Sequence, residues 1–134
     1  MKKSIALAGA MIALANIGEG AHSNGLLTRV AEGAVVKGQI LKKGSTDREV
    51  AACAELTDVG LYVALDSAAT GELVPVAALG NATGTVLVTA SGAIAVGDLV
   101  SPTGTAVTTG LTCGRAIVAA ADGDLFEMAH KVCA

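Results

Sequence analysis

The chain has 134 residues, the usual length of one domain, which excludes two independent hydrophobic cores. Hydrophobic residues make up 52% of it, yet there is one Phe, one Tyr and no Trp, so small side chains must fill the core. Nine Lys and Arg against 12 Asp and Glu give a formal charge of −3, and with neither clustered cations nor aromatic stacking platforms the chain is not expected to bind nucleic acid.

Small side chains also limit the stability of an isolated copy. Each buried CH₂ contributes about 0.8 kcal/mol, while the entropy cost of ordering the backbone does not fall with side-chain size. We therefore expect an isolated monomer to be marginally stable and to gain stability from partners or self-association.

The N-terminus supports two interpretations. Lys2-Lys3 precedes an apolar run, Ile5–Ile17, and Ala21-His22-Ser23 fits a cleavage site, as in a secretory signal. Alternatively, residues 1–25 are a retained N-terminal arm whose apolar side chains are covered by a partner subunit. The run is shorter than the roughly 20 residues of a membrane-spanning helix, so no membrane partner is expected.

From Leu26 onward, short runs rich in β-branched residues alternate with turns that contain Gly. This pattern predicts a mainly β fold, a small β-sandwich or barrel-like domain over residues 26–134. The predicted strands are Leu26–Val30, Val35–Lys42, Glu49–Ala54, Gly60–Leu65, Leu73–Leu79, Thr85–Thr89, Ala93–Val96, Asp98–Ser101, Gly114–Ala119 and Leu125–His130.

Two halves of this region are similar in sequence. Similar segments occur in the same order in both halves: Ala34–Leu41 and Ala93–Val100, Gly60–Val63 and Gly114–Ile117, Gly71–Leu73 and Gly123–Leu125. The order predicts two similar β units, about 34–79 and 93–130, which pack as one domain because neither buries its apolar face alone. Chance similarity in a chain rich in Gly, Ala and Val is the alternative.

Enzyme motifs are absent from the sequence: it contains no GxSxG, GxxxxGK[ST], HExxH or GxGxxG. We predict no catalytic, cofactor-binding or metal-ligating residues and no cofactor. A small hydrolase using Cys113 or one of the histidines, His22 and His130, is the remaining enzyme hypothesis. The cysteines, Cys53, Cys113 and Cys133, have no CxxC spacing and are expected to be small buried side chains or a free thiol.

Two charged clusters have simple interpretations. Asp122-Gly123-Asp124 with Glu127 has the carboxylates that attract Ca²⁺, but a polar hairpin turn explains it better. Lys42-Lys43 before Gly44 is typical of a solvated strand end.

Several segments resemble one protein family: Asn16–Gly25, Thr28-Arg29, Ile40–Gly44, Val74–Gly80, Ile94–Asp98 and Ala119–Glu127. Residues 16–134 are similar in overall pattern to the small capsid cement, or head decoration, proteins of tailed bacteriophages, the DUF2190-like group. The extension Lys2–Leu14 departs from that pattern. Because Asn16–Gly25 lies inside the similar region, the resemblance favours a retained arm over a cleaved signal.

The resemblance implies a non-enzymatic virion protein made in the host cytoplasm. Such a protein binds the outer surface of an icosahedral head as a homotrimer and stabilises the shell by bridging subunits of the major capsid protein. The alternative is a secreted bacterial structural or adhesive β protein with a cleaved N-terminal signal.

Overall fold

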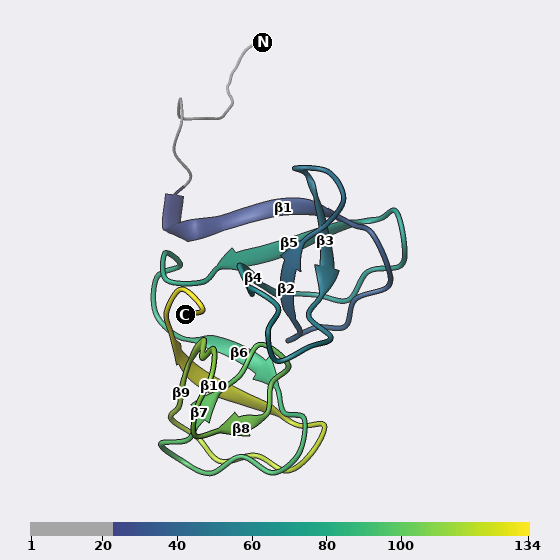
Figure 1. The fold of residues 1–134 in the computed structure, drawn as a ribbon. Helices are drawn as coiled ribbons and strands as arrows, with labels where there is room; N and C mark the ends of the chain where they lie inside the picture. The colour runs from purple at the N-terminus through teal and green to yellow at the C-terminus, as the bar shows by residue number, and fades with distance from the viewer. Residues whose placement is uncertain (1–22) are drawn as a thin grey trace.

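The computed structural model describes residues 23–134, which form two successive five-stranded units (Figure 1). A short 3₁₀ turn, η2 (Ser23–Gly25), leads into the first unit. The first unit contains β1 (Leu26–Ala31), β2 (Ile40–Lys43), β3 (Glu49–Ala52), β4 (Tyr62–Ala64) and β5 (Leu73–Ala78). The second contains β6 (Val86–Thr89), β7 (Leu99–Val100), β8 (Ala106–Val107), β9 (Gly114–Ala116) and β10 (Leu125–His130). The predicted mainly β fold is confirmed.

The first unit is a closed barrel with the strand order β1-β3-β2-β4-β5. Neighbouring strands are antiparallel except β1 and β3, whose parallel pairing closes the barrel. Its interior is small and aliphatic, and its largest fully buried side chains are Leu41, Val50, Val74 and Val76. Side chains of this size can fill the narrow interior of a five-stranded barrel without voids.

The second unit has the equivalent strand order, β6-β10-β9-β7-β8, but its sheet stays open. An isolated bridge joins Val35 to Ala68 in the first unit, and a matching bridge joins Ile94 to Ala120 in the second. The two units differ in the length of one hairpin. β2 and β3 have four residues each, whereas the equivalent strands β7 and β8 have two each. The short β7–β8 hairpin does not add a strand to β6 as β3 does to β1.

Three barrel strands are buried on both faces. Side chains alternate between the faces of a strand. In β2, β4 and β5, adjacent residues therefore pack on opposite sides. The residues that face the barrel interior are Leu41, Ala64 and Val76. The residues that pack against the second unit are Ile40, Val63 and Ala77. The core between the units also contains Phe126 and Met128 of β10, so the two units share this hydrophobic cluster, while a second cluster fills the barrel.

Gly38 connects the two units through its backbone. The Thr89 N–H donates to the Gly38 carbonyl at 2.9 Å, and the Thr89 hydroxyl donates to the Lys37 carbonyl at 2.8 Å. Gly38 has φ +88°, and a Cβ there would lie 2.5 Å from Thr89 Oγ1 and 2.8 Å from Thr89 N. Only glycine allows both the backbone conformation and this close approach.

Several predicted strands were too long, and two of them differ most from the structure. Val35–Lys42 contains the bridge residue Val35, then a turn, and β2 begins only at Ile40. The positive φ of Gly38 ends the extended backbone there, and the period-2 pattern did not reveal it. Ala93–Val96 is reduced to the bridge residue Ile94, while β8 lies in a segment where no strand was predicted.

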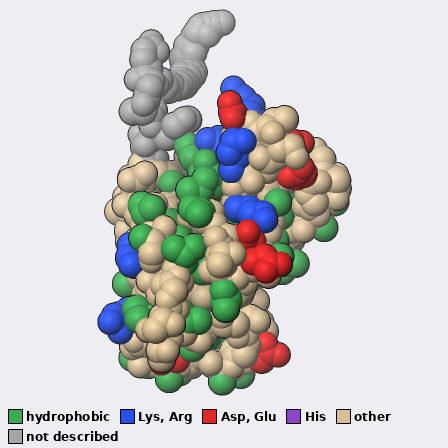
Figure 2. Space-filling view, viewed as in Figure 1, with side chains coloured by type: hydrophobic (Ala, Val, Ile, Leu, Met, Phe, Trp, Pro, Cys, Tyr) green, Lys and Arg blue, Asp and Glu red, His purple; other side chains and the backbone are tan. Residues whose placement is uncertain are grey.

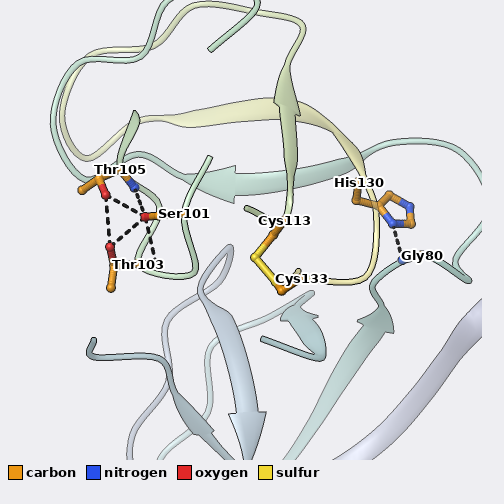
Figure 3. The surroundings of a disulfide bond; sticks show 7 residues. All are labelled: Gly80, Ser101, Thr103, Thr105, Cys113, His130 and Cys133. Atoms are coloured by element: carbon orange, nitrogen blue, oxygen red, sulfur yellow. Dashed lines mark hydrogen bonds between the residues drawn. A yellow bond between two sulfur atoms is a disulfide. The ribbon is translucent and has the colours of Figure 1, made fainter. Parts of the chain in front are cut away.

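A disulfide bond fastens the C-terminal segment to the second unit (Figure 3). Cys113 and Cys133 are joined and both are buried in the shared core, so the expectation of unbridged small side chains was wrong for this pair. Thr112 and Ala134 exchange backbone hydrogen bonds of 2.9 and 3.1 Å alongside the bond. Sequence spacing did not reveal the pairing, because the chain brings the two sulfurs together only through the β9–β10 hairpin.

His130 links the end of β10 to the loop before β6. Its Nδ1 accepts from the Gly80 N–H at 2.8 Å, and its Nε2 lies 3.0 Å from the Gly84 carbonyl (Figure 3 shows the first bond). Because a carbonyl only accepts, these partners assign the proton to Nε2. The ring is therefore a structural clamp on residues 80–84.

Replacing His130 by alanine is expected to lower the free energy of unfolding by about 1–2 kcal/mol, since two hydrogen bonds of ordinary strength are lost. Chemical denaturation measures the change. Amide hydrogen exchange should show faster exchange at Gly80, with β9 amides unaffected as the internal control; unchanged exchange at Gly80 would contradict the clamp.

Candidate interaction surface

Five leucines in strands or directly beside one are exposed, with exposed fractions between 38% and 69%. They are Leu26, Leu65, Leu73, Leu87 and Leu125. Four of them lie in β1, β5, β6 and β10, and Leu65 directly follows β4. Both units therefore contribute, and we call these five residues the leucine surface. Figure 2 shows hydrophobic side chains on one face of both units. Apolar side chains gathered on strand faces are typical of interaction sites.

Two hollows lie within the leucine surface and share Leu26 and Leu65. The first, which we call the β1–β5 hollow, is also lined by Thr28, Arg48 and Pro75. The second, the inter-unit groove, lies between the units and is lined mainly by apolar side chains. Its lining consists of Leu26, Lys37, Ala64, Leu65, Ala77, Ala82, Thr83, Thr85, Val86 and Leu87.

Strand alternation explains why these leucines face outward. In β1, Leu27 packs against the barrel core, so Leu26 and Thr28 face the other way. In β5, Val74 is fully buried, which places Leu73 and Pro75 on the outer face. A strand facing only water would carry polar residues at these positions.

Charged side chains gather around the β2–β3 hairpin (Figure 2), and two of them, Asp47 and Arg48, also line the β1–β5 hollow. Lys42 pairs with Asp58 at 3.1 Å, and Lys43 lies 3.8 Å from Asp47. The predicted solvated strand end at Lys42-Lys43 is confirmed, since β2 ends at Lys43 and the Lys43 side chain is 55% exposed.

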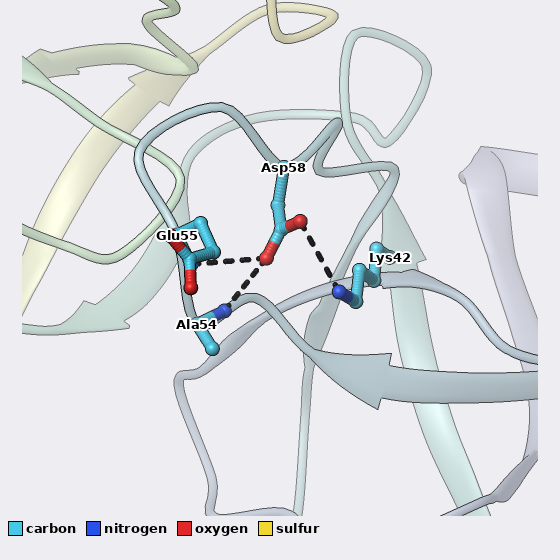
Figure 4. A network of polar contacts seen from close by, with 4 residues as sticks. All are labelled: Lys42, Ala54, Glu55 and Asp58. Atoms are coloured by element: carbon cyan, nitrogen blue, oxygen red, sulfur yellow. Dashed lines mark hydrogen bonds and ion pairs between the residues drawn. The ribbon is translucent and has the colours of Figure 1, made fainter.

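Asp58 organises the loop between β3 and β4 (Figure 4). One carboxylate oxygen accepts from the N–H groups of Ala54 and Glu55 at 2.8 and 3.0 Å, and the other accepts from Lys42. The two backbone hydrogen bonds, and then Lys42, lower the pKa of Asp58. A carboxylate with a lowered pKa stabilises the fold above its ordinary pKa, and this contribution is lost as the pH falls through the lowered value.

Cys53 is the free cysteine of the described residues and lies next to this loop. Burial, and then the charge of Asp58, raise the pKa of its thiol from 9.0 to about 11. At pH 8 the thiolate fraction is therefore roughly a hundred-fold lower than for an ordinary cysteine.

The thiol of Cys53 is expected to react with iodoacetamide at pH 8 at least about a hundred-fold more slowly in the folded protein than in urea. Mass spectrometry of the alkylated chain measures the rate. Cys113 and Cys133 do not compete while their disulfide is intact, so the urea sample serves as control. Equal rates in both samples would show that Cys53 is accessible and unperturbed.

The other residues considered in the sequence have structural roles where they are described. Asp122 accepts from the Gly92 N–H at 2.8 Å, as a turn residue does. Cys113 is in the disulfide and is not a free nucleophile, and His22 lies outside the described residues. Within residues 23–134, no group of three or more His, Cys, Asp or Glu side chains is placed to hold a metal ion. Over the same residues, none of the helices is long and apolar enough to cross a membrane.

The leucine surface was missed by sequence reasoning, although one signal was present. Leu73 and Pro75 are two residues apart in a predicted strand, and a fully buried valine lies between them. Apolar residues on both faces of a strand indicate that both faces are covered. The sequence alone did not show whether the other unit or an external partner covers the outer face of this strand.

Comparison with known proteins gives a structural likeness but no match in sequence. No protein-family model matches the chain, and no curated protein matches it in sequence. Among solved structures, the head fiber gp8.5 N base of bacteriophage phi29 superposes with a TM-score of 0.62 at 24% sequence identity. The alignment covers 81% of this chain and 92% of that chain. The two proteins share a fold. The resemblance to capsid cement proteins is not tested by this likeness and remains a prediction.

Proposed function

We propose that this chain is a non-enzymatic structural virion protein that binds the outer surface of an icosahedral phage head. In this role it stabilises the shell by bridging subunits of the major capsid protein. The fold shared with a bacteriophage head fiber base carries the proposal, since the alignment extends over most of both chains. Fold likeness alone does not assign a function, so the surface must supply the second argument.

The outer face of β5 supports such a contact. Leu73 is 69% exposed and Pro75 lines the β1–β5 hollow, so both offer apolar area that is not used within the described chain. Burying an exposed leucine contributes about 1.5–3 kcal/mol, which is substantial for a chain with so few large side chains.

Assembly as a homotrimer strengthens weak contacts of this kind. Three linked copies convert later binding events into intramolecular ones, so avidity exceeds the affinity of each site. A protein whose single contacts are weak is then retained on a particle that presents many equivalent sites.

The test is binding to heads that lack the protein. Wild-type chain should co-sediment with such heads and raise the temperature at which they release DNA. Leu73→Asp should bind at least ten-fold more weakly. Leu56→Asp is a matched control, since Leu56 is 54% exposed but lies in the loop between β3 and β4 and is not part of the leucine surface. Absence of the chain from purified particles, or equal heat resistance with and without it, would refute the proposal.

One observation favours a second candidate, the secreted structural or adhesive β protein. Disulfides persist in oxidising compartments, and Cys113 and Cys133 are joined by one. Intact mass of the protein from its native source separates the two candidates: a mature chain beginning near Asn24 supports secretion, and a chain retaining residues 1–22 supports the virion protein.

A further inference from the structure

The edge of β1 on the β3 side carries an unpaired backbone donor at Thr28. Val30 donates to the Arg48 carbonyl at 2.8 Å on this side, whereas Ala31 donates to the Glu72 carbonyl at 2.9 Å on the β5 side. Backbone N–H groups alternate between the two sides of a strand, so the Thr28 N–H points to the same side as the Val30 N–H. Within residues 23–134, β3 pairs with Val30 and Ala31 and does not reach Thr28.

The β5 side of Thr28 agrees with this direction. Thr28 lies opposite Pro75, and proline has no N–H to donate. The Pro75 carbonyl accepts from the Leu65 N–H at 2.9 Å, on the side of β5 that faces away from β1. Thr28 also lines the β1–β5 hollow, so its N–H is a donor that a partner in this hollow can reach.

Two arginines line the same hollow without an acidic partner. They are Arg29 and Arg48, and neither forms an ion pair with a carboxylate of residues 23–134. The carboxylate of Asp47 also lines the hollow, but it lies 3.8 Å from Lys43, whose charge offsets it. The hollow is therefore positively charged on a chain whose net charge is −3.

Arg29 is held in place but retains hydrogen-bonding capacity. Its guanidinium lies 5.5 Å from the centroid of the Tyr62 ring, and its Nη1 donates to the Thr28 carbonyl at 3.0 Å. Its Nε is buried and has no hydrogen-bond partner within the described chain. A guanidinium carries five N–H donors, and a carboxylate is the partner whose geometry matches them.

An extended acidic segment fits these features together. A backbone carbonyl of the segment accepts from the Thr28 N–H, and an acidic side chain beside it reaches the two arginines. Apolar side chains of the segment then contact Leu65 and Pro75, which line the same hollow. Addition of a strand to a sheet edge uses the backbone for affinity and the neighbouring side chains for specificity.

We propose that the β1–β5 hollow binds an extended acidic segment of a protein of the phage head, with a carboxylate against Arg29 and Arg48. This inference rests on the proposed function, because it names the chemistry of the partner at the same surface. Contact through arginines weakens as the salt concentration rises, because salt screens exposed charges. Contact through leucines alone does not weaken in this way.

Binding of the full chain to heads that lack it tests the charge. Arg48→Glu is expected to bind at least ten-fold more weakly than wild type at low ionic strength, and the difference should shrink at about 1 M salt. Arg48→Lys keeps the charge and should stay within about three-fold of wild type. Arg115→Glu is the matched control: Arg115 is also exposed, but it lies in β9, outside the hollow, and should bind like wild type.

Amide hydrogen exchange tests the backbone contact. In the free full chain, the Thr28 amide should exchange at least about a hundred-fold faster than the Arg29 amide, which points to β5. On heads, exchange of residues 26–29 measured by mass spectrometry should slow for the wild-type chain and for Arg115→Glu. Urea denaturation should give the same midpoint for all variants, which shows that each is folded.

The outcomes separate this inference from the proposed function. A wild-type chain that does not bind heads would refute both. If wild type binds, equal binding by Arg48→Glu, or an equal loss in Arg115→Glu, overturns the acidic segment and leaves the proposed function standing. Slow exchange of the Thr28 amide in the free chain would show that the edge is already paired, and this result also overturns the inference alone.

Discussion

Phe126→Ala is expected to lower the free energy of unfolding by about 3–5 kcal/mol, the largest effect of any single substitution considered for this chain. Phe126 is 1% exposed and lies in the core shared by the two units. The surrounding side chains are short and fixed by strand backbones on both sides, so they cannot collapse into the space left by the ring. Urea denaturation followed by circular dichroism measures the change.

The control for Phe126 is an exposed apolar residue of similar type. Leu73 lies in β5, the counterpart of β10, and is 69% exposed, so Leu73→Ala should change the free energy of unfolding by no more than about 0.5 kcal/mol. If Phe126→Ala were equally mild, the two units would not depend on a common core.

Reduction of the Cys113–Cys133 disulfide is expected to lower the free energy of unfolding by about 3 kcal/mol. The two cysteines are 20 residues apart, and a loop of this size gives roughly that constraint on the unfolded chain. Reduction leaves both side chains in place, so the change measures the cross-link rather than lost packing. Urea unfolding with and without dithiothreitol gives the value directly.

A Cys113→Ala/Cys133→Ala variant separates the bond from other effects of the reductant. Its unfolding midpoint should not respond to dithiothreitol, while the wild-type midpoint should fall. An identical response in both proteins would mean that the disulfide does not contribute. Because the bond fastens residues 131–134, its reduction should also speed amide exchange at Ala134, which donates to the Thr112 carbonyl.

Local sequence predicted much of the strand content because the signals for strands are local. Leu73–Leu79 and Leu125–His130 were predicted within one residue of β5 and β10, since valines, large apolar residues and flanking glycines mark their ends. Predictions failed where a single glycine turn lies inside an alternating apolar pattern or where a strand is very short. Val35–Lys42 was interrupted at Gly38, and the two residues of β8 lie among threonines that suit strands and loops equally.

The candidate surface could not be predicted in the same way. Leu26, Leu65 and Leu87 are far apart in sequence and meet only because the inter-unit groove brings their strands together. The disulfide and the clamp at His130 are long-range in the same sense: the histidine contacts a glycine 50 residues away. No local pattern encodes which distant residue occupies the other side of a contact.

The sequence by itself determined the class of fold and the size of the core, because composition limits side-chain volume and alternation with Gly turns favours short strands. The tertiary structure decided that the first unit closes into a barrel and the second stays open. The physical reason is the length of one hairpin: β2 and β3 are long enough for β3 to pair with β1, while β7 and β8 end after two residues and add no strand to the outer side of β6. Closure depends on which strand ends meet in space, and that is settled only when the whole chain has folded.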